Sequence, residues 1–236
     1  MKNFEAELSS RQMLLLITAI TVLAAALRFY LLGDKSFWLD EGNSWVIAQL
    51  PAGAFWRRLW SQEFNMVAYY GLLRAWLHLG SSEAVIRALS VIPAVATVPA
   101  VYELGSHLFD RRTGIVATLL LAIHPAHVAY SQEARGYTLA ILLCLLSTRL
   151  FVRVVEAPGW GFVALYALMS ALAIYTHFFA ALILPAQAVS LLAWRKRLPV
   201  GRLSAAAAAI LVLAVPAAVF ILTRDIGQLA WIKATS

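Results

Sequence analysis

The chain has 236 residues, of which 62% are hydrophobic and 13% are charged, and its formal net charge is +7. Soluble domains contain roughly 45–50% apolar and about 25% charged residues, so this composition excludes an ordinary soluble protein and predicts an all-α polytopic membrane protein. The positive charge is attributed to membrane topology and lipid contact, and no nucleic-acid partner is predicted. The single cysteine, Cys144, lies in an apolar stretch and offers no disulfide framework.

Apolar stretches long enough to cross a bilayer recur along the chain. A spanning helix needs about 20 mostly apolar residues, and about 17 suffice. The stretch at 160–194 carries no formal charge and would form about 52 Å of helix, which exceeds a hydrocarbon core of about 30 Å. It therefore predicts two spans with a turn near Tyr175, Thr176 and His177. About seven transmembrane helices are predicted in total, at residues 13–32, 84–104, 114–130, 137–155, two within 160–194, and 203–223.

The N-terminal stretch lacks a small-residue cleavage site, so it is predicted to be a retained helix rather than a signal peptide. The long segment at 33–82 is predicted to lie at the membrane surface. Aromatic and leucine residues recur at i, i+4 spacing within 54–64, which predicts an interfacial amphipathic helix. Residues 66–79 predict a second, more apolar helix that is too short to span. No internal repeat or linker is evident, so residues 1–236 are taken as a single domain.

The distribution of Lys and Arg predicts the orientation in the membrane, because cytoplasmic loops are enriched in these residues. With seven spans and a cytoplasmic N-terminus, residues 33–82, residues 124–137 and His177 would share the external side of the inner or plasma membrane. Ten of the nineteen basic residues would then lie in short cytoplasmic segments, namely Lys2, Arg11, Arg111, Arg112, Arg149, Arg153, Arg195, Lys196, Arg197 and Arg202.

Two adjacent carboxylates, Asp40 and Glu41, follow the first predicted span and lie between Trp38 and Trp45. A carboxylate that is partly desolvated by aromatic neighbours at a membrane surface can act as a general base. Alternatively, Asp40 is the N-cap of a helix at residues 41–50, and Glu41 is a favourable first-turn acid. Both interpretations can hold, because capping fixes the position of a carboxylate.

A second polar group lies between the third and fourth predicted spans, where Glu133, Arg135 and Tyr137 follow one another closely. Side chains two positions apart in a helix diverge, so Glu133 and Arg135 are expected to face different partners. Arginine is suited to bidentate contact with phosphate oxygens. The alternative is a surface loop whose charges meet water and lipid headgroups.

Histidines complete the set of candidate residues. His177, at the predicted turn, is either a helix-end polar residue or a contact for a ligand. His124 and His127 flank Pro125, which disrupts helical placement, and no third ligand follows at metal-type spacing. No metal site and no cofactor are predicted, and a requirement for a divalent metal is left open.

These residues occur in an order that resembles the N-terminal module of GT-C-fold glycosyltransferases. The resemblance is carried by Asp40-Glu41, by the segments at 64–70 and 87–90, by the Ser-Gln-Glu-Ala-Arg-Gly-Tyr block at 131–137, and by the segment at 175–179. The chain is similar to the bacterial branch related to protein O-mannosyltransferases and to lipid A aminoarabinose transferases. The resemblance covers nearly the whole chain.

The resemblance implies a membrane enzyme that transfers a sugar from a polyprenyl-phosphate donor to an acceptor at the external face, with inversion. Asp40 matches the acid that deprotonates the acceptor hydroxyl, and Glu41 matches its companion, which orients Asp40 or binds the acceptor. Arg135 matches a basic residue near the donor phosphate, and Glu133 matches a second acid that lines the cavity. Tyr137 and His177 are further candidates for donor contact.

Two alternatives to the enzyme remain open from the sequence. The protein could instead be a non-catalytic polyprenyl-lipid-binding or flippase-like module, or a structural module of a larger complex. Family members are usually longer, with further spans after the shared module, so this chain is expected to be either a fragment or a minimal version. The acceptor, whether glycan, lipid or protein, is not predicted.

Overall fold

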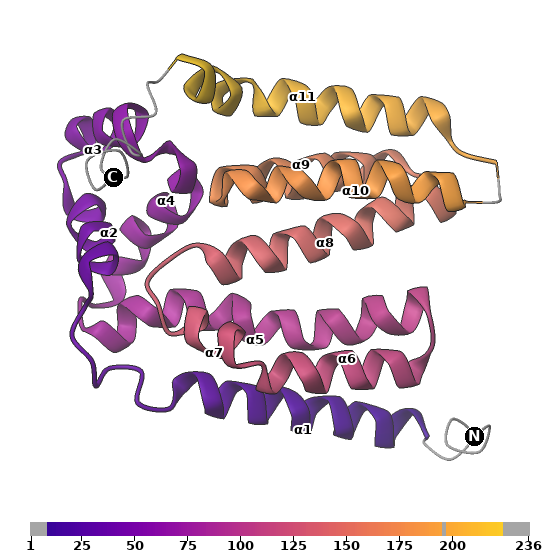
Figure 1. Cartoon of the computed structure of the whole chain (residues 1–236), viewed down its shortest axis with the longest axis horizontal. Helices are drawn as coiled ribbons and strands as arrows, with labels where there is room; N and C mark the ends of the chain where they lie inside the picture. The colour runs from indigo at the N-terminus through magenta and orange to yellow at the C-terminus, as the bar shows by residue number, and fades with distance from the viewer. Residues whose placement is uncertain (1–8, 195–196, 224–236) are drawn as a thin grey trace, which may run out of the picture.

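The protein is a bundle of helices that lie side by side, with a cluster of shorter helices packed across one end (Figure 1). The computed structural model describes residues 9–194 and 197–223, and every regular element within them is helical. Lys2, Arg195 and Lys196, which contribute to the predicted orientation, lie outside the described residues, as does the end of the chain from residue 224.

The bundle is built from long helices that run between two ends. These are α1 (Ser10–Phe29), α5 (Glu83–Leu108), α6 (Arg111–Ile123), α8 (Tyr137–Glu156), α9 (Trp160–Thr176) and α11 (Val200–Thr223). The shorter helices are α2 (Leu39–Gln49), α3 (Ala52–Arg58), α4 (Val67–Trp76), α7 (Pro125–Ser131) and α10 (Ile183–Ser190). Tighter or wider turns occupy Leu59–Glu63, Phe64–Met66, Leu77–Leu79, Phe178–Leu182 and Leu191–Ala193.

Within residues 9–194 and 197–223, four helices, α1, α5, α8 and α11, are long and apolar enough to cross a membrane, and the bent pair α6 and α7 would make a fifth. The stretch predicted to hold two spans does turn where expected, because α9 ends at Thr176 and His177 follows it. However, α9 and the helical stretch Phe178–Ala193 are shorter than a standard span. Both run the length of the bundle in Figure 1, and the count of seven spans stays a prediction.

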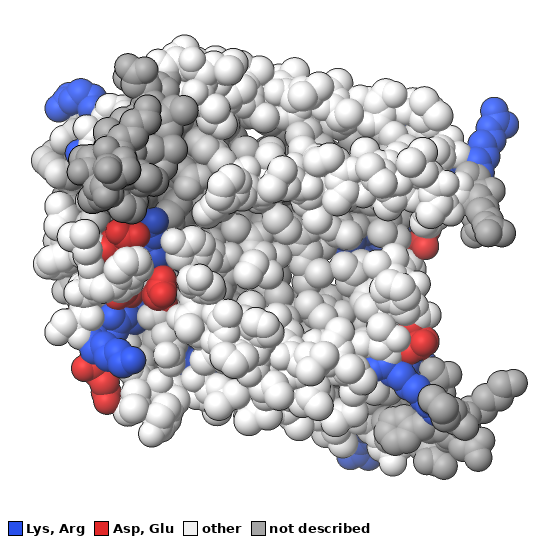
Figure 2. Space-filling model, viewed as in Figure 1, with Lys and Arg blue, Asp and Glu red and all other residues white. Residues whose placement is uncertain are grey.

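On the face shown in Figure 2, charged side chains gather toward the two ends of the bundle, and the surface between them is almost entirely uncharged. The end that carries the start of α1 also carries the α5–α6 and α8–α9 connections (Figure 1). The opposite end carries α2, α3 and α4, together with α7 and the start of α8. The polar segments predicted to share one side of the membrane therefore meet at one end of the molecule.

The predicted third span is broken rather than continuous. α6 ends at Ile123, and α7 begins at Pro125 after a bend of 56°. Proline lacks the N–H that would continue the helix, so it leaves carbonyls at the end of α6 without their usual donors. The buried guanidinium of Arg28, which lies near the end of α1, donates to the carbonyls of Leu121 and Ala122 at 3.1 and 2.9 Å. This contact explains how α1 accommodates a basic residue.

The helix predicted at residues 54–64 is also interrupted. α3 ends at Arg58, and a π-helical turn over Leu59–Glu63 follows. Phe55 and Leu59 are buried against the bundle, whereas Trp56 and Trp60 are exposed. The apolar stripe thus divides between the protein interior and the surface. The second predicted helix forms as α4, and its Tyr69, Tyr70 and Leu73 are fully buried.

The crossing of α5 and α6 depends on close backbone approach at Gly114. A Cβ atom at this position would lie 2.9 Å from the carbonyl oxygen of Tyr102 in α5. We expect Gly114→Ala to lower the thermal unfolding midpoint of the detergent-solubilised protein by about 2 °C or more, because the two backbones must separate. Gly71→Ala in α4 is the matched control, since a Cβ there meets nothing within 4 Å. Equal midpoints for the two variants would contradict this account of the crossing.

Candidate active site

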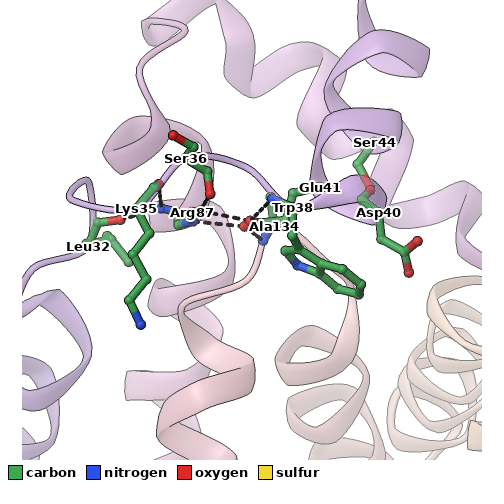
Figure 3. Close-up of polar contacts among 9 residues, drawn as sticks. All are labelled: Leu32, Lys35, Ser36, Trp38, Asp40, Glu41, Ser44, Arg87 and Ala134. Atoms are coloured by element: carbon green, nitrogen blue, oxygen red, sulfur yellow. Dashed lines mark hydrogen bonds and ion pairs between the residues drawn. The ribbon is translucent and has the colours of Figure 1, made fainter.

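A buried ion pair between Glu41 and Arg87 lies at the centre of the polar end of the bundle (Figure 3). The two oxygens of Glu41 accept from Nε and Nη2 of Arg87, each at 2.8 Å. The Glu41 side chain is 1% exposed and the Arg87 side chain 5%. A bidentate pair of this kind is both strong and geometrically specific, so it fixes α2 against α5.

Each residue of the pair also forms hydrogen bonds to backbone groups of other segments. Arg87 donates from its remaining N–H groups to the carbonyls of Leu32, Lys35 and Ser36, so all five of its donors are used. Glu41 accepts from the backbone N–H of Ala134 at 2.8 Å and of Trp38 at 3.4 Å. The pair therefore connects the loop after α1, the start of α2, α5 and the loop before α8.

The first turn of α2 differs in one respect from the alternative in which Asp40 is the N-cap. The helix starts at Leu39 with Trp38 at the N-cap, so Asp40 is not the N-cap and lies within the first turn. Glu41 takes the helix-start role instead, since its carboxylate accepts the N–H of Trp38. This arrangement points Glu41 into the ion pair and leaves the Asp40 carboxylate directed away from it (Figure 3). The two adjacent acids therefore have different environments.

Asp40 faces Arg135 from the loop before α8. The distance from Oδ2 of Asp40 to Nη2 of Arg135 is 3.6 Å, and the side chains are 42% and 14% exposed. This distance is too long for a hydrogen bond, so the carboxylate keeps its lone pairs for another donor. The site thus places an accessible carboxylate beside a partly buried cation. The carboxylate can accept a proton, and the cation can compensate the charge of an anion.

The backbone around Arg135 is held rigidly. The hydroxyl of Ser90 in α5 donates to the Arg135 carbonyl at 2.9 Å, and the Tyr69 hydroxyl lies 2.9 Å from the same Ser90 oxygen. At Gly136, a Cβ would lie 3.1 Å from the Thr176 carbonyl oxygen and 3.2 Å from Cβ of Tyr69. Only glycine fits this approach without displacement, so the residue fixes the direction in which Arg135 points.

An apolar groove of about 680 Å³ begins beside Arg135 and follows α8. Tyr137 and His177 line it, and the Arg135 guanidinium carbon lies 5.8 Å from the Tyr137 ring centre. From Tyr137 the groove continues to Thr148, a length of about 16 Å at helical rise. We call this cavity the α8 groove; its other lining residues are Thr97, Val101, Leu121, Tyr130, Ala140, Ile141, Cys144, Leu145, Ala180 and Ile183.

His177 is placed to donate at the polar end of the groove. Its Nδ1 accepts the N–H of Phe179 at 3.3 Å, which leaves the hydrogen of the neutral ring on Nε2. Burial, together with the charge of Arg135, holds the pKa of His177 below its usual value. The ring is therefore neutral at neutral pH and can donate one hydrogen bond from Nε2.

Glu133 lines a different cavity from the groove beside Arg135, although both residues lie in the non-helical segment between α7 and α8, where helical spacing does not apply. This second cavity, which we call the loop pocket, has a volume of about 710 Å³. Burial and the nearby Glu41 raise the pKa of the Glu133 carboxyl. The pocket is lined by Leu27, Tyr30, Leu31, Leu32, Lys35, Ser36, Trp38, Glu41, Arg87, Val128, Ala129, Gln132 and Glu133.

Sequence reasoning did not identify one acidic group near the site. Glu63, in the π-helical turn, accepts from the Asn43 amide at 3.4 Å and from the Tyr70 hydroxyl at 3.3 Å. Asn43 lies one turn after Asp40 on α2. The sequence offered one indication of this residue, because Glu63 directly precedes the segment at 64–70 that carries the family resemblance. Arg87 also belonged to a resemblance segment, but its pairing with Glu41 spans 46 residues and has no local spacing signal.

The histidines near the α6–α7 bend take part in the protein's own contacts. Nδ1 of His127 lies 2.8 Å from Nη2 of Arg28, and Nδ1 of His124 accepts the N–H of His127 at 3.3 Å. Among the described residues, no three side chains of metal-ligating type lie together.

A comparison with known families gives a match that covers about two thirds of the chain. The profile of the family described as dolichyl-phosphate-mannose-protein mannosyltransferase matches residues 66–221. The chain belongs to this family. Its members are membrane glycosyltransferases of the GT-C type, which confirms the resemblance noted in the sequence. A search of curated proteins finds no match.

The match includes Arg87, Glu133, Arg135, Tyr137 and His177, whereas Asp40 and Glu41 precede it. The catalytic assignment of Asp40 and Glu41 and the donor-binding assignment of Glu133, Arg135, Tyr137 and His177 stay predictions. What the structure adds is their arrangement: Asp40 and Arg135 face one another, Tyr137 and His177 follow in the α8 groove, and Glu133 lines the loop pocket.

The burial of the Glu41–Arg87 pair predicts a large loss of stability when one of the two side chains is removed. Glu41→Ala leaves a buried guanidinium without its counter-charge, which costs about 3–5 kcal/mol, and for a chain of this size each kcal/mol corresponds to about 2–4 °C. We expect the thermal midpoint to fall by on the order of 10 °C in detergent. The control is Arg149→Ala, which breaks the more exposed Arg149–Glu103 pair and should change the midpoint by only about 0–4 °C. Similar decreases in the thermal midpoint for both variants would show that the buried pair stabilises the protein no more than the exposed pair does.

Proposed function

We propose that the protein transfers a sugar from a polyprenyl-phosphate donor to an acceptor hydroxyl, with Asp40 as the general base. The observation that carries the proposal is the position of an accessible carboxylate facing a cation at the head of an apolar groove. A lipid-phosphate donor requires the cation and the groove, and hydroxyl attack requires the carboxylate. The family to which the chain belongs supports the reaction class.

In this proposal the donor lies with its prenyl chain in the α8 groove. The groove is lined mainly by apolar side chains and lies between helices that are apolar enough to span a membrane. The donor phosphate would meet the Arg135 guanidinium, with a hydrogen bond from Nε2 of His177. Tyr137 would contact the same headgroup.

The chemical step is a single displacement. Asp40 takes the proton from the acceptor hydroxyl, whose oxygen attacks C1 of the sugar as the bond from C1 to the phosphate oxygen breaks. The electron pair of that bond leaves with the polyprenyl phosphate, and Arg135 compensates the charge that develops there. Attack opposite the leaving group inverts the configuration at C1. Glu41 acts through position only, because its oxygens are occupied by Arg87 and backbone N–H groups.

We also propose that this end of the bundle faces the outside of the cell membrane, with the N-terminus in the cytoplasm. Basic residues at the opposite end support this orientation, including Arg11, Arg111, Arg112, Arg149 and Arg153. The alternative of a binding or flippase-like module would use the same groove and Arg135 but would not need an accessible base. The presence of Asp40 beside Arg135 is what favours the enzyme.

The Asp40→Asn variant distinguishes sugar transfer from polyprenyl-phosphate binding. The amide retains the shape of the side chain but cannot take a proton at neutral pH, so sugar transfer should fall by at least about 100-fold, while polyprenyl-phosphate binding remains. Transfer is measured by release of radiolabelled sugar from the donor in proteoliposomes. Asp34→Asn, at an exposed position in the preceding loop, is the matched control and should retain full activity. Near-normal transfer by the Asp40 variant would exclude Asp40 as the base.

Arg135→Gln tests the phosphate site. Loss of a charge-assisted contact of about 1.5–3 kcal/mol should weaken polyprenyl-phosphate binding by about 10- to 100-fold. Arg57→Gln, at an exposed position in α3, is the control and should bind as the unaltered protein does. Binding is measured by competition against a photoreactive prenyl phosphate. Unchanged affinity in the Arg135 variant would remove this residue from the donor site.

A further inference from the structure

The loop pocket is a second cavity at the same end of the bundle, separate from the α8 groove. The two cavities share no lining residue. The indole of Trp38 stands between the Glu41–Arg87 pair and the Asp40 carboxylate in Figure 3, and it lines the loop pocket. A ligand in the loop pocket would therefore contact Trp38, two residues before Asp40, and would touch no residue that lines the groove.

The lining of the loop pocket has an apolar part and a polar part. The apolar part comes from the end of α1 and from α7, through Leu27, Leu31, Leu32, Val128 and Ala129. The polar part comes from Lys35, Ser36, Gln132 and Glu133. A volume of about 710 Å³ falls within the usual range of ligand sites, roughly 300–1,000 Å³. The shape and chemistry suit a molecule with a hydrocarbon part and a polar headgroup.

The pocket offers one cation that the protein does not use itself. Arg87 also lines it, but Glu41 balances its charge and all five of its donors are taken. Within the described residues, no carboxylate lies within ion-pair distance of Nζ of Lys35, which points away from Arg87 in Figure 3. Burial raises the pKa of the Glu133 carboxyl, which lines the pocket together with Glu41. An anionic ligand would supply the counter-charge that Lys35 does not receive from a carboxylate of the described residues.

The mouth of the pocket is apolar as well. Tyr30 and Leu31 line it and are 70% and 55% exposed. They follow directly on α1, which is a candidate membrane span. Exposed apolar side chains at the end of a span lie at the boundary of lipid and water. A ligand would thus enter from the membrane.

We propose that the loop pocket binds an anionic amphiphile, whose headgroup contacts Nζ of Lys35 and whose chain lies against Leu27, Leu31 and Val128. Two sources share this chemistry. One is an anionic phospholipid of the bilayer. The other is a lipid-linked acceptor, and this second source rests on the function proposed above.

Binding is tested by native mass spectrometry of the full-length protein in detergent, with dioleoylphosphatidylglycerol and dioleoylphosphatidylcholine as probes. The unaltered protein should retain the anionic lipid preferentially. Lys35→Gln should reduce phosphatidylglycerol adducts about fivefold and leave phosphatidylcholine adducts unchanged. Ala129→Trp, which fills the apolar part, should reduce both. Arg57→Gln removes an exposed cation outside the pocket and should change neither.

Phosphatidylglycerol adducts that survive both Lys35→Gln and Ala129→Trp would overturn the proposal. An equal loss in the Lys35 and Arg57 variants would also overturn it, because general surface charge would then explain the preference. The Asp40→Asn variant should bind the probes as the unaltered protein does, so a failure of the catalytic proposal leaves this measurement intact.

A transfer assay distinguishes the two sources. If the pocket holds the acceptor, Lys35→Gln lowers sugar transfer into the lipid fraction of proteoliposomes but leaves binding of prenyl phosphate to the α8 groove unchanged. If it holds a bilayer phospholipid, the same variant loses phosphatidylglycerol adducts and transfers sugar at the normal rate. Either result is consistent with an anionic amphiphile at Lys35.

Discussion

The polar end of the molecule depends on the ion pair between Glu41 and Arg87. A guanidinium with five donors and a carboxylate with two oxygens together hold backbone from the loop after α1, from the start of α2 and from the loop before α8. Removing both charges from water is costly, and the geometry of this pair and its additional hydrogen bonds offset that cost. Its consequence is positional, because Asp40 and Arg135, 95 residues apart, come to face one another beside it.

The pair also explains why two adjacent acids behave differently. Successive residues in the first turn of α2 point in different directions, so Glu41 enters the interior while Asp40 faces the surface. Glu41 is a positioning residue whose oxygens are already occupied. Asp40 stays accessible at 42% exposure and at 3.6 Å from its partner. Both residues of the Glu41–Arg87 pair line the loop pocket, and the α8 groove shares no lining residue with that pocket.

Features encoded by composition and local pattern were predicted well from the sequence. The fourth predicted span at 137–155 matches α8 within one residue, and the turn at Thr176 and His177 follows from the length of an uncharged stretch. Glu133 and Arg135 have different partners, but they lie in the non-helical segment between α7 and α8, so the helical-spacing argument does not account for it. Long-range features were not predictable in this way. The contact of Arg28 with carbonyls at the end of α6 depends on a bend, and the partner of Glu41 lies 46 residues away. The alternative interpretation of Asp40 as an N-cap was wrong, because the helix begins at Leu39 and the Glu41 carboxylate accepts the N–H of the N-cap residue Trp38.

We propose that this polar end transfers a sugar from a prenyl-phosphate carrier. The most direct measurement uses the full chain in proteoliposomes with a radiolabelled polyprenyl-phosphate sugar and a membrane extract as the acceptor source. The label is followed into lipid, protein and glycan fractions, and the configuration at C1 of the product is determined. We expect the label to leave the prenyl phosphate and to appear in one acceptor fraction with inverted configuration. A donor that binds tightly but remains intact would contradict it and would identify the protein as a lipid-binding module.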